Sequence, residues 1–512
     1  MHNKNNPPLS LLLLFLCLSI SSTSAWAKGL SANTSVTSTT TEPLPPVLAQ
    51  THFADNLAGT TTPETLPDSI LLLLKKYKIP TENLSVYVRD LNAKQPLLAH
   101  NIDVIRSPAS TMKLLTTYAA LKILSPNYSW RTEAWVRGEI VDGTLAGDLI
   151  IKGYGDPFLS YENYSQFVRG LREKGLKHIQ GDVIIDNSYF DIGDFNPAAF
   201  DNKPFRTYNA APSALMFNFQ STRFLFTPDE ENKKIVVTPY PAIPSFKFTN
   251  EINYTDKRCR RSHYRPKFSV DKEQNLTIKG WYSKKCGQKF ILRALSTPEE
   301  HAFNGFRDFW MEQGGTLNGT LRIAQKQSGD TRFHLSSSAT LGEQIRLINK
   351  WSNNVMTRQV LLTLGAKRYG VPATLQKGRD AVIETLQESH IQTNGIVIDN
   401  GSGLSRTARI TARQMAQLLE TAYREPYMPE FMASLALSGL DGTMVRRFRK
   451  GDLRGRSHMK TGTLNNVTAI AGYMLNRQGK RLVIVIQHNG KKTNRGRGKK
   501  IQNALLRWSF EQ

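Results

Sequence analysis

Three short motifs occur in one order along the chain, and together they carry the residue types that acyl transfer needs. Ser110-Thr-Met-Lys113 comes first, Ser352-Asn-Asn354 follows, and Lys460-Thr-Gly462 comes last. Each motif alone is weak, because Ser269 to Lys272 repeats the first spacing and Ser31 to Asn33 repeats the second. Their combination favours a serine nucleophile, since the first motif opens an apolar-periodic segment and the last precedes two strand-like runs.

The first motif supplies a nucleophile and a base. Ser110 and Lys113 are three residues apart, so on a helix their side chains lie on one face. A neutral lysine amine can accept the serine proton, but an exposed lysine titrates at about 10.4 and is a poor base. The role therefore requires burial or a nearby cation, for which Lys460 is the candidate. A serine at a helix start also has a free backbone N–H for a developing oxyanion.

The other two motifs supply groups that handle the substrate. Ser352 offers a hydroxyl that can pass a proton to a leaving amine, and Asn354 offers an amide that can hold a peptide. Lys460 with Thr461 and Thr463 can bind a terminal carboxylate, and the backbone N–H of Thr463 is the second candidate oxyanion donor. Gly462 leaves room for a substrate backbone to lie along a strand edge.

Other catalytic signatures are missing from the sequence. There is no His-Glu-x-x-His zinc motif, no phosphate-binding loop that ends in Gly-Lys-Ser or Gly-Lys-Thr, and no Gly-x-Ser-x-Gly. The chemistry of the three motifs needs no metal and no cofactor, so we expect neither.

The elements that position these residues can be read from periodicity. A helix is expected after Pro108, with Ser110 in its first turn. Strands are expected at 84–88, 96–99, 469–474 and 482–486, helices from about 340 onward, and an amphipathic helix at the C-terminus. The 242 positions between Ser110 and Ser352 contain alternating, strand-like segments. We therefore predict an α/β (α+β) fold with a long, mainly β insertion.

The composition divides the 512 residues into four parts. Residues 1–27 have the basic start, apolar core and small-x-small end of a secretion signal. Residues 28–65 are rich in Ser, Thr and Pro and are expected to be a flexible tether. Residues 66–132 together with 335–512 are predicted to form the catalytic domain. Residues 133–334 are predicted to be inserted, with one of two possible subdomains around 239–300.

Export bears on the cysteines and on the charge. Cys259 and Cys286 remain after the signal, and an oxidising compartment favours a disulfide between them, with two free thiols as the alternative.

The net charge of +25 favours binding to polyanions. In an exported chain this indicates anionic lipids or acidic wall polymers rather than nucleic acid, or simply a solvated surface. No later apolar stretch is long enough to cross a bilayer, so at most peripheral membrane contact is expected.

Through these motifs, the chain from about residue 66 onward resembles the class C low-molecular-mass penicillin-binding proteins. These are the D-alanyl-D-alanine carboxypeptidases and endopeptidases. The resemblance extends to Gly153-Tyr-Gly-Asp156-Pro157, to the run 399–406 that ends in Arg406, and to 439–443. It also includes the long insertion between the first two motifs.

The resemblance implies a penicillin-recognising transpeptidase-like domain interrupted by smaller domains. It implies that a peptidoglycan stem peptide acylates Ser110 in the periplasm, that Lys113 is the base, and that Ser352 with Lys460 relays the proton to D-Ala. β-Lactams would be covalent inhibitors. Asp156 would hold the ammonium group of the stem-peptide diamino acid and Arg406 its carboxylate. This chain has Asn353 where many relatives have Asp, and Thr463 where others have Ser.

Two other functions are open at this point. A β-lactamase would share the nucleophile but release the penicillin adduct rapidly, whereas a peptidase would keep it for minutes or longer. A non-catalytic peptidoglycan-binding protein would use the basic surface and the aromatic insertion, although the complete motif set speaks against it. For Asp156 the alternative is a turn residue, and for Arg406 a surface ion pair.

Overall fold

A computed structural model describes residues 65–512 of the chain. The predicted secretion signal and almost all of the predicted tether lie outside the described residues. Among residues 65–512, no helix is both long enough and apolar enough to cross a membrane.

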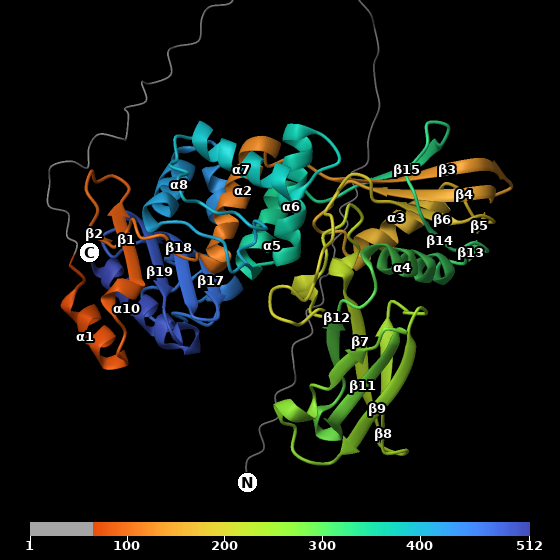
Figure 1. The fold of residues 1–512 in the computed structure, drawn as a ribbon, viewed down its shortest axis with the longest axis horizontal. Coiled ribbons are helices and arrows are strands. Elements are labelled where there is room, and N and C mark those ends of the chain that lie inside the picture. The colour runs from red at the N-terminus through yellow and green to blue at the C-terminus, as the bar shows by residue number, and fades with distance from the viewer. Residues whose placement is uncertain (1–64) are drawn as a thin grey trace, which may run out of the picture. The chain divides into compact units, whose positions relative to one another are not determined.

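A six-stranded antiparallel sheet joins the two ends of the described chain (Figure 1). Its strands, in spatial order, are β16 (Ala436–Leu437), β17 (Ser457–Leu464), β18 (Val467–Leu475), β19 (Arg481–Asn489), β1 (Leu84–Asp90) and β2 (Leu98–His100). The pairing of β1 with β19 runs from Leu84 opposite His488 to Asp90 opposite Leu482. The strands expected from alternation at 84–88, 469–474 and 482–486 lie in this sheet, whereas only the second half of the strand expected at 96–99 does, since β2 begins at Leu98.

Side-chain alternation lets helices cover both faces of this sheet. On β19, Leu482, Ile484 and Ile486 pack with α1 (Asp68–Tyr77) and α10 (Arg497–Glu511). Val483 and Val485 face the other way, toward a core that contains α2 (Lys113–Leu124) and α8 (Ala412–Arg424). Nearly every residue of α2 is buried, so it is the central helix of that layer.

The other helices of this layer begin at identifiable caps. α5 (Leu341–Trp351) starts with a capping box between Thr340 and Glu343. It ends where Ser352 adopts a left-handed conformation (φ 60°), and Asn353 then caps α6 (Asn354–Tyr369). The remaining two are α7 (Leu375–Glu388) and α9 (Met428–Ala433). The break between α5 and α6 therefore falls on the second motif.

The segment between the first two motifs forms three further sheets. The largest has seven strands, β3 (Arg131–Val141), β4 (Thr144–Gly153), β5 (His178–Ile179), β6 (Val183–Asp186), β13 (Thr316–Leu317), β14 (Leu321–Ile323) and β15 (Thr331–Ser337). It packs with α3 (Tyr161–Glu173) and α4 (Pro298–Glu312) around one core. Because β3 and β15 pair with each other, this sheet extends slightly beyond the predicted 133–334 at both ends.

Two three-stranded sheets share a separate small core. One contains β9 (Lys247–Thr255), β10 (Lys267–Val270) and β11 (Asn275–Ser283), and the other contains β7 (Thr222–Asp229), β8 (Lys234–Tyr240) and β12 (Lys289–Arg293). Cys259 and Cys286 form a disulfide beside this core. The pair predicted from export is thus bonded, and it closes a loop within this small unit.

Candidate active site

Ser110 lies in a tight turn, not in a regular α-helix. Residues Ala109–Met112 form a 3-10 turn that leads into α2 at Lys113. Ala109 has a positive φ of 47°, and the Thr111 hydroxyl donates to the Pro108 carbonyl at 2.8 Å. The expected helix therefore begins three residues later than Ser110, and the turn fixes the serine at its N-terminal end.

Two glycines allow other segments to approach this turn closely. A Cβ on Gly403 would lie 1.9 Å from the Ala109 carbonyl oxygen, and a Cβ on Gly462 would lie 2.9 Å from the Ser110 nitrogen. Only a residue without a side chain fits at either position. The third motif is thus held directly against the backbone of Ser110.

Lys113 connects the first motif to the second. Its Nζ lies 3.3 Å from Ser110 Oγ and 2.6 Å from Asn354 Oδ1. The same Nζ donates to the Ser402 carbonyl oxygen at 2.6 Å. The side chain is completely buried, so three segments that are far apart in sequence meet at one amine.

The surroundings of Lys113 disfavour its protonated form. Burial lowers its pKa well below the ordinary lysine value, and the nearby charges of Lys460 and Arg358 lower it further. Both causes act in one direction, because desolvation and like charge each penalise the ammonium. The cation that the sequence suggested for this effect, Lys460, is one of the two.

Lys460 joins the second motif to the third. Its Nζ lies 3.0 Å from Ser352 Oγ and 2.9 Å from the Thr461 carbonyl oxygen. Burial lowers the pKa of Lys460 to about 7. Lys113 and Lys460 are thus both buried, and each contacts one serine hydroxyl, that of Ser110 and that of Ser352 respectively.

The third motif lies on β17, along an edge that is partly open. β16 pairs with only Met459 and His458 of β17. Within the described residues no strand covers that edge from Lys460 onward. Thr463 is exposed there, and the Thr461 hydroxyl donates to the Thr443 hydroxyl at 2.8 Å. An extended peptide can add to such an edge.

Asp156 contacts α5 near the start of that helix. Its Oδ1 accepts a hydrogen bond from the Phe158 backbone N–H at 2.9 Å and one from Gln344 Nε2 at 3.4 Å. Burial raises its pKa to about 6. The bond to Phe158 is the turn that the alternative interpretation expected. Gln344 is eight residues before Ser352 on α5, so Asp156 does not touch the catalytic cluster directly.

Arg406 is exposed, and its guanidinium carbon lies 4.5 Å from the centre of the Phe200 ring. Among residues 65–512 no carboxylate pairs with it, so the alternative of a surface ion pair is wrong for the described chain. Leu404, two residues earlier, packs with Phe200 near Ala109. The chain around Arg406 therefore approaches the nucleophile turn, while its side chain remains available.

Three groups near the cluster were not predicted. Ser402 contributes a backbone carbonyl, which no residue pattern can reveal. Thr443 ends the run 439–443, to which the resemblance extends, but no role was assigned to it. Arg358 follows Asn354 by one helical turn, and this spacing is the signal that could have indicated it. It is buried, donates to the Ala210 carbonyl at 3.0 Å, and has an Nε with no partner.

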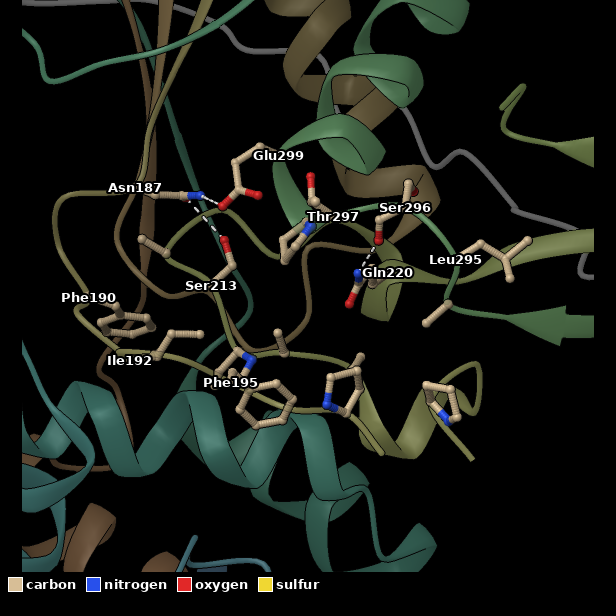
Figure 2. A pocket seen from close by; sticks show the side chains of 18 of the residues that line it. Asn187, Phe190, Ile192, Phe195, Ser213, Gln220, Leu295, Ser296, Thr297 and Glu299 are labelled. Atoms are coloured by element: carbon tan, nitrogen blue, oxygen red, sulfur yellow. Dashed lines mark hydrogen bonds between the residues drawn. The ribbon is translucent and has the colours of Figure 1, made fainter. Parts of the chain in front are cut away.

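A separate cavity of about 420 Å³ lies among loops of the inserted region (Figure 2). Asn187, Ser213 and Glu299 lie on one side of it, and Phe190 and Phe195 on the other. None of the predicted site residues lines this cavity. Among the described residues, no group of three or more His, Cys, Asp or Glu side chains is placed to hold a metal ion.

Known proteins are similar to this chain over most of its length. A D-alanyl-D-alanine carboxypeptidase (DacB) of Haemophilus influenzae is 24% identical over 421 residues, which cover 81% of this chain and 87% of that protein. A D-alanyl-D-alanine carboxypeptidase of an Actinomadura species is 28% identical over 407 residues, or 75% of this chain and 73% of that protein.

The same similarity is present in the fold. The crystal structure of penicillin-binding protein 4 (dacB) from Haemophilus influenzae matches with a TM-score of 0.74 at 22% identity, covering 86% of this chain and 99% of that one. This confirms the predicted mixed α/β fold with additional domains. The model of the D-Ala-D-Ala carboxypeptidase 3 (S13) family matches residues 68–512. The chain therefore belongs to the D-Ala-D-Ala carboxypeptidase 3 (S13) family, as its motifs predicted.

Proposed function

We propose that this chain is a serine-type D-alanyl-D-alanine carboxypeptidase, with endopeptidase action, that cleaves peptidoglycan stem peptides through an acyl-Ser110 intermediate. The observation that carries the proposal is the position of Lys113 Nζ between Ser110 Oγ and Asn354 Oδ1. Family membership supports the same reaction class.

The contacts of Lys113 suit a neutral base. A neutral amine has two N–H groups and one lone pair. Asn354 Oδ1 and the Ser402 carbonyl oxygen, each at 2.6 Å, accept the two N–H groups. The lone pair then remains for Ser110 Oγ at 3.3 Å, and burial and the charges of Lys460 and Arg358 lower the pKa in the direction that favours this neutral amine. Lys113 can therefore take the Ser110 proton as Oγ attacks the penultimate D-Ala carbonyl.

The attack places negative charge on the carbonyl oxygen of the substrate. We assign the backbone N–H groups of Ser110 and Thr463 as donors to that oxyanion. The support is the close approach at Gly462, which brings β17 against the Ser110 nitrogen. The peptide would lie along the open edge of β17. The side-chain amide of Asn354 would hold one backbone amide of that peptide.

Collapse of this intermediate breaks the amide C–N bond, and the departing D-Ala amine needs a proton. Ser352 Oγ lies 3.0 Å from Lys460 Nζ, so Ser352 can give its proton to the amine and regain one from protonated Lys460. Water then attacks the Ser110 ester and breaks its acyl C–O bond. Ser110 Oγ takes back the proton held by Lys113, and the proton lost by the water restores Lys460, so the enzyme returns to its first state. In the protonated form, Lys460 binds the terminal carboxylate together with the hydroxyls of Thr461 and Thr463.

We assign Asp156 and Arg406 to the diamino acid of the stem peptide. Asp156 meets α5 eight residues before Ser352, which is roughly 12 Å along a helix. That separation suits a side chain that is remote from the scissile bond. Arg406 has no carboxylate partner among residues 65–512, so its charge is available for the carboxylate of the diamino acid.

The setting that we propose is the periplasm, or more generally a place outside the cytoplasmic membrane. The basis is the predicted signal at 1–27, which lies outside the described residues, and the disulfide between Cys259 and Cys286. β-Lactams are the expected covalent inhibitors, because they present an amide-like carbonyl to Ser110. Peptidoglycan, and not nucleic acid, is the expected polymeric partner.

The first test is to label the mature protein with a fluorescent penicillin and to follow the covalent band over time. The wild type should give a band that lasts minutes or longer, and Ser110→Ala should give none. Ser269→Ala is a matched control, because it alters an exposed Ser-x-x-Lys on β10 and should label normally.

The second measurement is release of D-Ala from a peptide that ends in D-Ala-D-Ala. Turnover by Ser110→Ala would refute the assignment of the nucleophile. Rapid loss of the penicillin band would favour a β-lactamase. A folded wild type that neither labels nor releases D-Ala would favour a non-catalytic wall-binding protein.

A further inference from the structure

The end of α1 and the start of α10 form one exposed, positively charged surface. We define the basic face by six residues that are all exposed, Lys75, Lys76, Arg446, Arg497, Lys499 and Lys500. They come from three segments, namely α1, the loop that precedes β17, and α10. Figure 1 shows α1 and α10 beside each other, and both helices pack on the same core.

Contacts between the three segments make this face continuous. Arg497 Nη1 donates to the Tyr77 carbonyl oxygen at 3.2 Å, and Lys500 Nζ lies 5.3 Å from the centre of the Tyr77 ring. Burial, together with the charges of Arg447 and Arg446, lowers the pKa of Lys499. The cations of α10 are therefore close to α1 on one side and to the 446–447 loop on the other.

The basic face lacks local acidic partners. Residues 445–510 contain 17 Lys and Arg residues but only one acidic residue, Asp452. Asp452 pairs with Arg477, and so does Glu511. Within residues 65–512 no carboxylate forms an ion pair with any of the six cations. Their charge is compensated only by solvent ions, which an anionic partner would release.

An apolar side chain stands among these charges. Leu72 is 68% exposed, more than any other large hydrophobic residue of the described chain. It precedes Lys75 and Lys76 by three and four positions on α1, so the three side chains lie on one helical face. An exposed leucine beside lysines is the arrangement of a segment that rests on a lipid headgroup layer.

We propose that the basic face, with Leu72, docks the protein on an anionic phospholipid bilayer. The cations attract the negative surface, and Leu72 inserts at the boundary of headgroups and acyl chains. A soluble acidic polymer would need the cations but would gain nothing from an isolated leucine. None of the residues assigned to catalysis belongs to this face, so docking leaves the catalytic cluster unaltered.

The test is sedimentation of the mature chain, which starts at residue 28, with vesicles. One set contains phosphatidylcholine alone and the other contains added phosphatidylglycerol. We expect binding to the anionic vesicles only, and a steep loss of binding as salt is raised.

Two variants examine the two parts of the surface. Lys75→Gln/Lys76→Gln/Lys499→Gln/Lys500→Gln should weaken binding by roughly two to three orders of magnitude, since each surface cation contributes about fivefold or slightly less. Leu72→Gln should weaken binding about tenfold. Penicillin labelling of each variant verifies that the catalytic domain is folded.

The matched control removes four exposed cations from the inserted region, Lys257→Gln/Arg258→Gln/Arg260→Gln/Arg261→Gln. It should bind anionic vesicles like the wild type. An equal loss in the control would show a general charge effect and overturn the proposal. Absence of wild-type binding at low salt would also overturn it. Normal vesicle binding by Leu72→Gln, with weakened binding of soluble polyphosphate by the four-lysine variant, would assign the surface to a soluble polyanion instead.

Discussion

Replacing Gly462 by alanine tests whether the third motif is clamped against the nucleophile. The added Cβ would lie 2.7 Å from the Pro108 carbonyl oxygen, 2.9 Å from the Ser110 nitrogen and 3.0 Å from Ala109 Cβ. The first distance is about 0.7 Å inside ordinary van der Waals contact. Two of these atoms belong to the backbone, so rotation of a side chain cannot relieve the overlap.

The strain must move either β17 or the turn that carries Ser110. Overpacking of this kind costs about 1 to 3 kcal/mol of stability. Lys460 lies two residues before Gly462 on the same strand. A displacement of several tenths of an ångström therefore also disturbs the contact of Lys460 with Ser352. Because misplacement by 1 Å can reduce a rate about a hundredfold, we expect acylation to slow by about 10- to 100-fold.

The assay is the second-order rate of acylation by a fluorescent penicillin, together with the thermal midpoint. Gly329→Ala is the matched control, because a Cβ there meets nothing within 4 Å and its φ is not in the left-handed region. It should leave both quantities unchanged. If Gly462→Ala acylated as fast as Gly329→Ala, the two segments would yield freely and the reasoning about the clamp would be refuted.

Three further predictions concern charge. Arg358→Met removes a like charge that lowers the pKa of Lys113, so the acid limb of the acylation profile should shift to higher pH by about one unit or less, whereas Arg358→Lys should retain it. Arg358 forms no ion pair within residues 65–512, and the charge of Asp399 only partly offsets the cost of its burial, so the thermal midpoint of Arg358→Met should not fall; a lower midpoint with an unshifted profile would contradict both points. Burial lowers the pKa of Lys460 to about 7, so KM for a peptide with a free carboxylate should rise above pH 7, while KM for the corresponding amide should not. Burial raises the pKa of Asp156 to about 6 from about 3.9 unfolded, so its stabilising contribution is present below pH 3.9 and is lost as pH rises through 6. Asp156→Asn should therefore be at least as stable as the wild type at pH 8, but slower on peptides that carry the diamino acid. Equal rates would show that Asp156 only stabilises the turn to Phe158.

Sequence patterns predicted those features that depend on the type and spacing of side chains. Period-two alternation indicated the strands of the six-stranded sheet, and Ser-x-x-Lys and Lys-Thr-Gly marked residues that meet in the fold. The tight turn before α2 was not foreseeable, because it depends on the positive φ of Ala109 and on the glycines that approach it.

Other features escaped prediction because they depend on tertiary contacts. The Ser402 carbonyl is a backbone group, and every residue type has one. The effect of Arg358 on Lys113 requires that α6 bury a second cation close to the Lys113 amine. The sequence suggested two roles for Asp156. Only its contact with Gln344 shows which part of α5 Asp156 approaches.

The pairing of β1 with β19 has a consequence for the order in which the chain folds. Leu84 lies opposite His488, so the centre of the six-stranded sheet cannot close until nearly all of the chain is present. Such long-range pairing is slow, because loop closure must precede the contacts that stabilise it. The inserted sheets, whose strands are closer in sequence, can form earlier. During synthesis the six-stranded sheet would thus remain open, and the cluster around Ser110 and Lys460 would form only after the last strand is available.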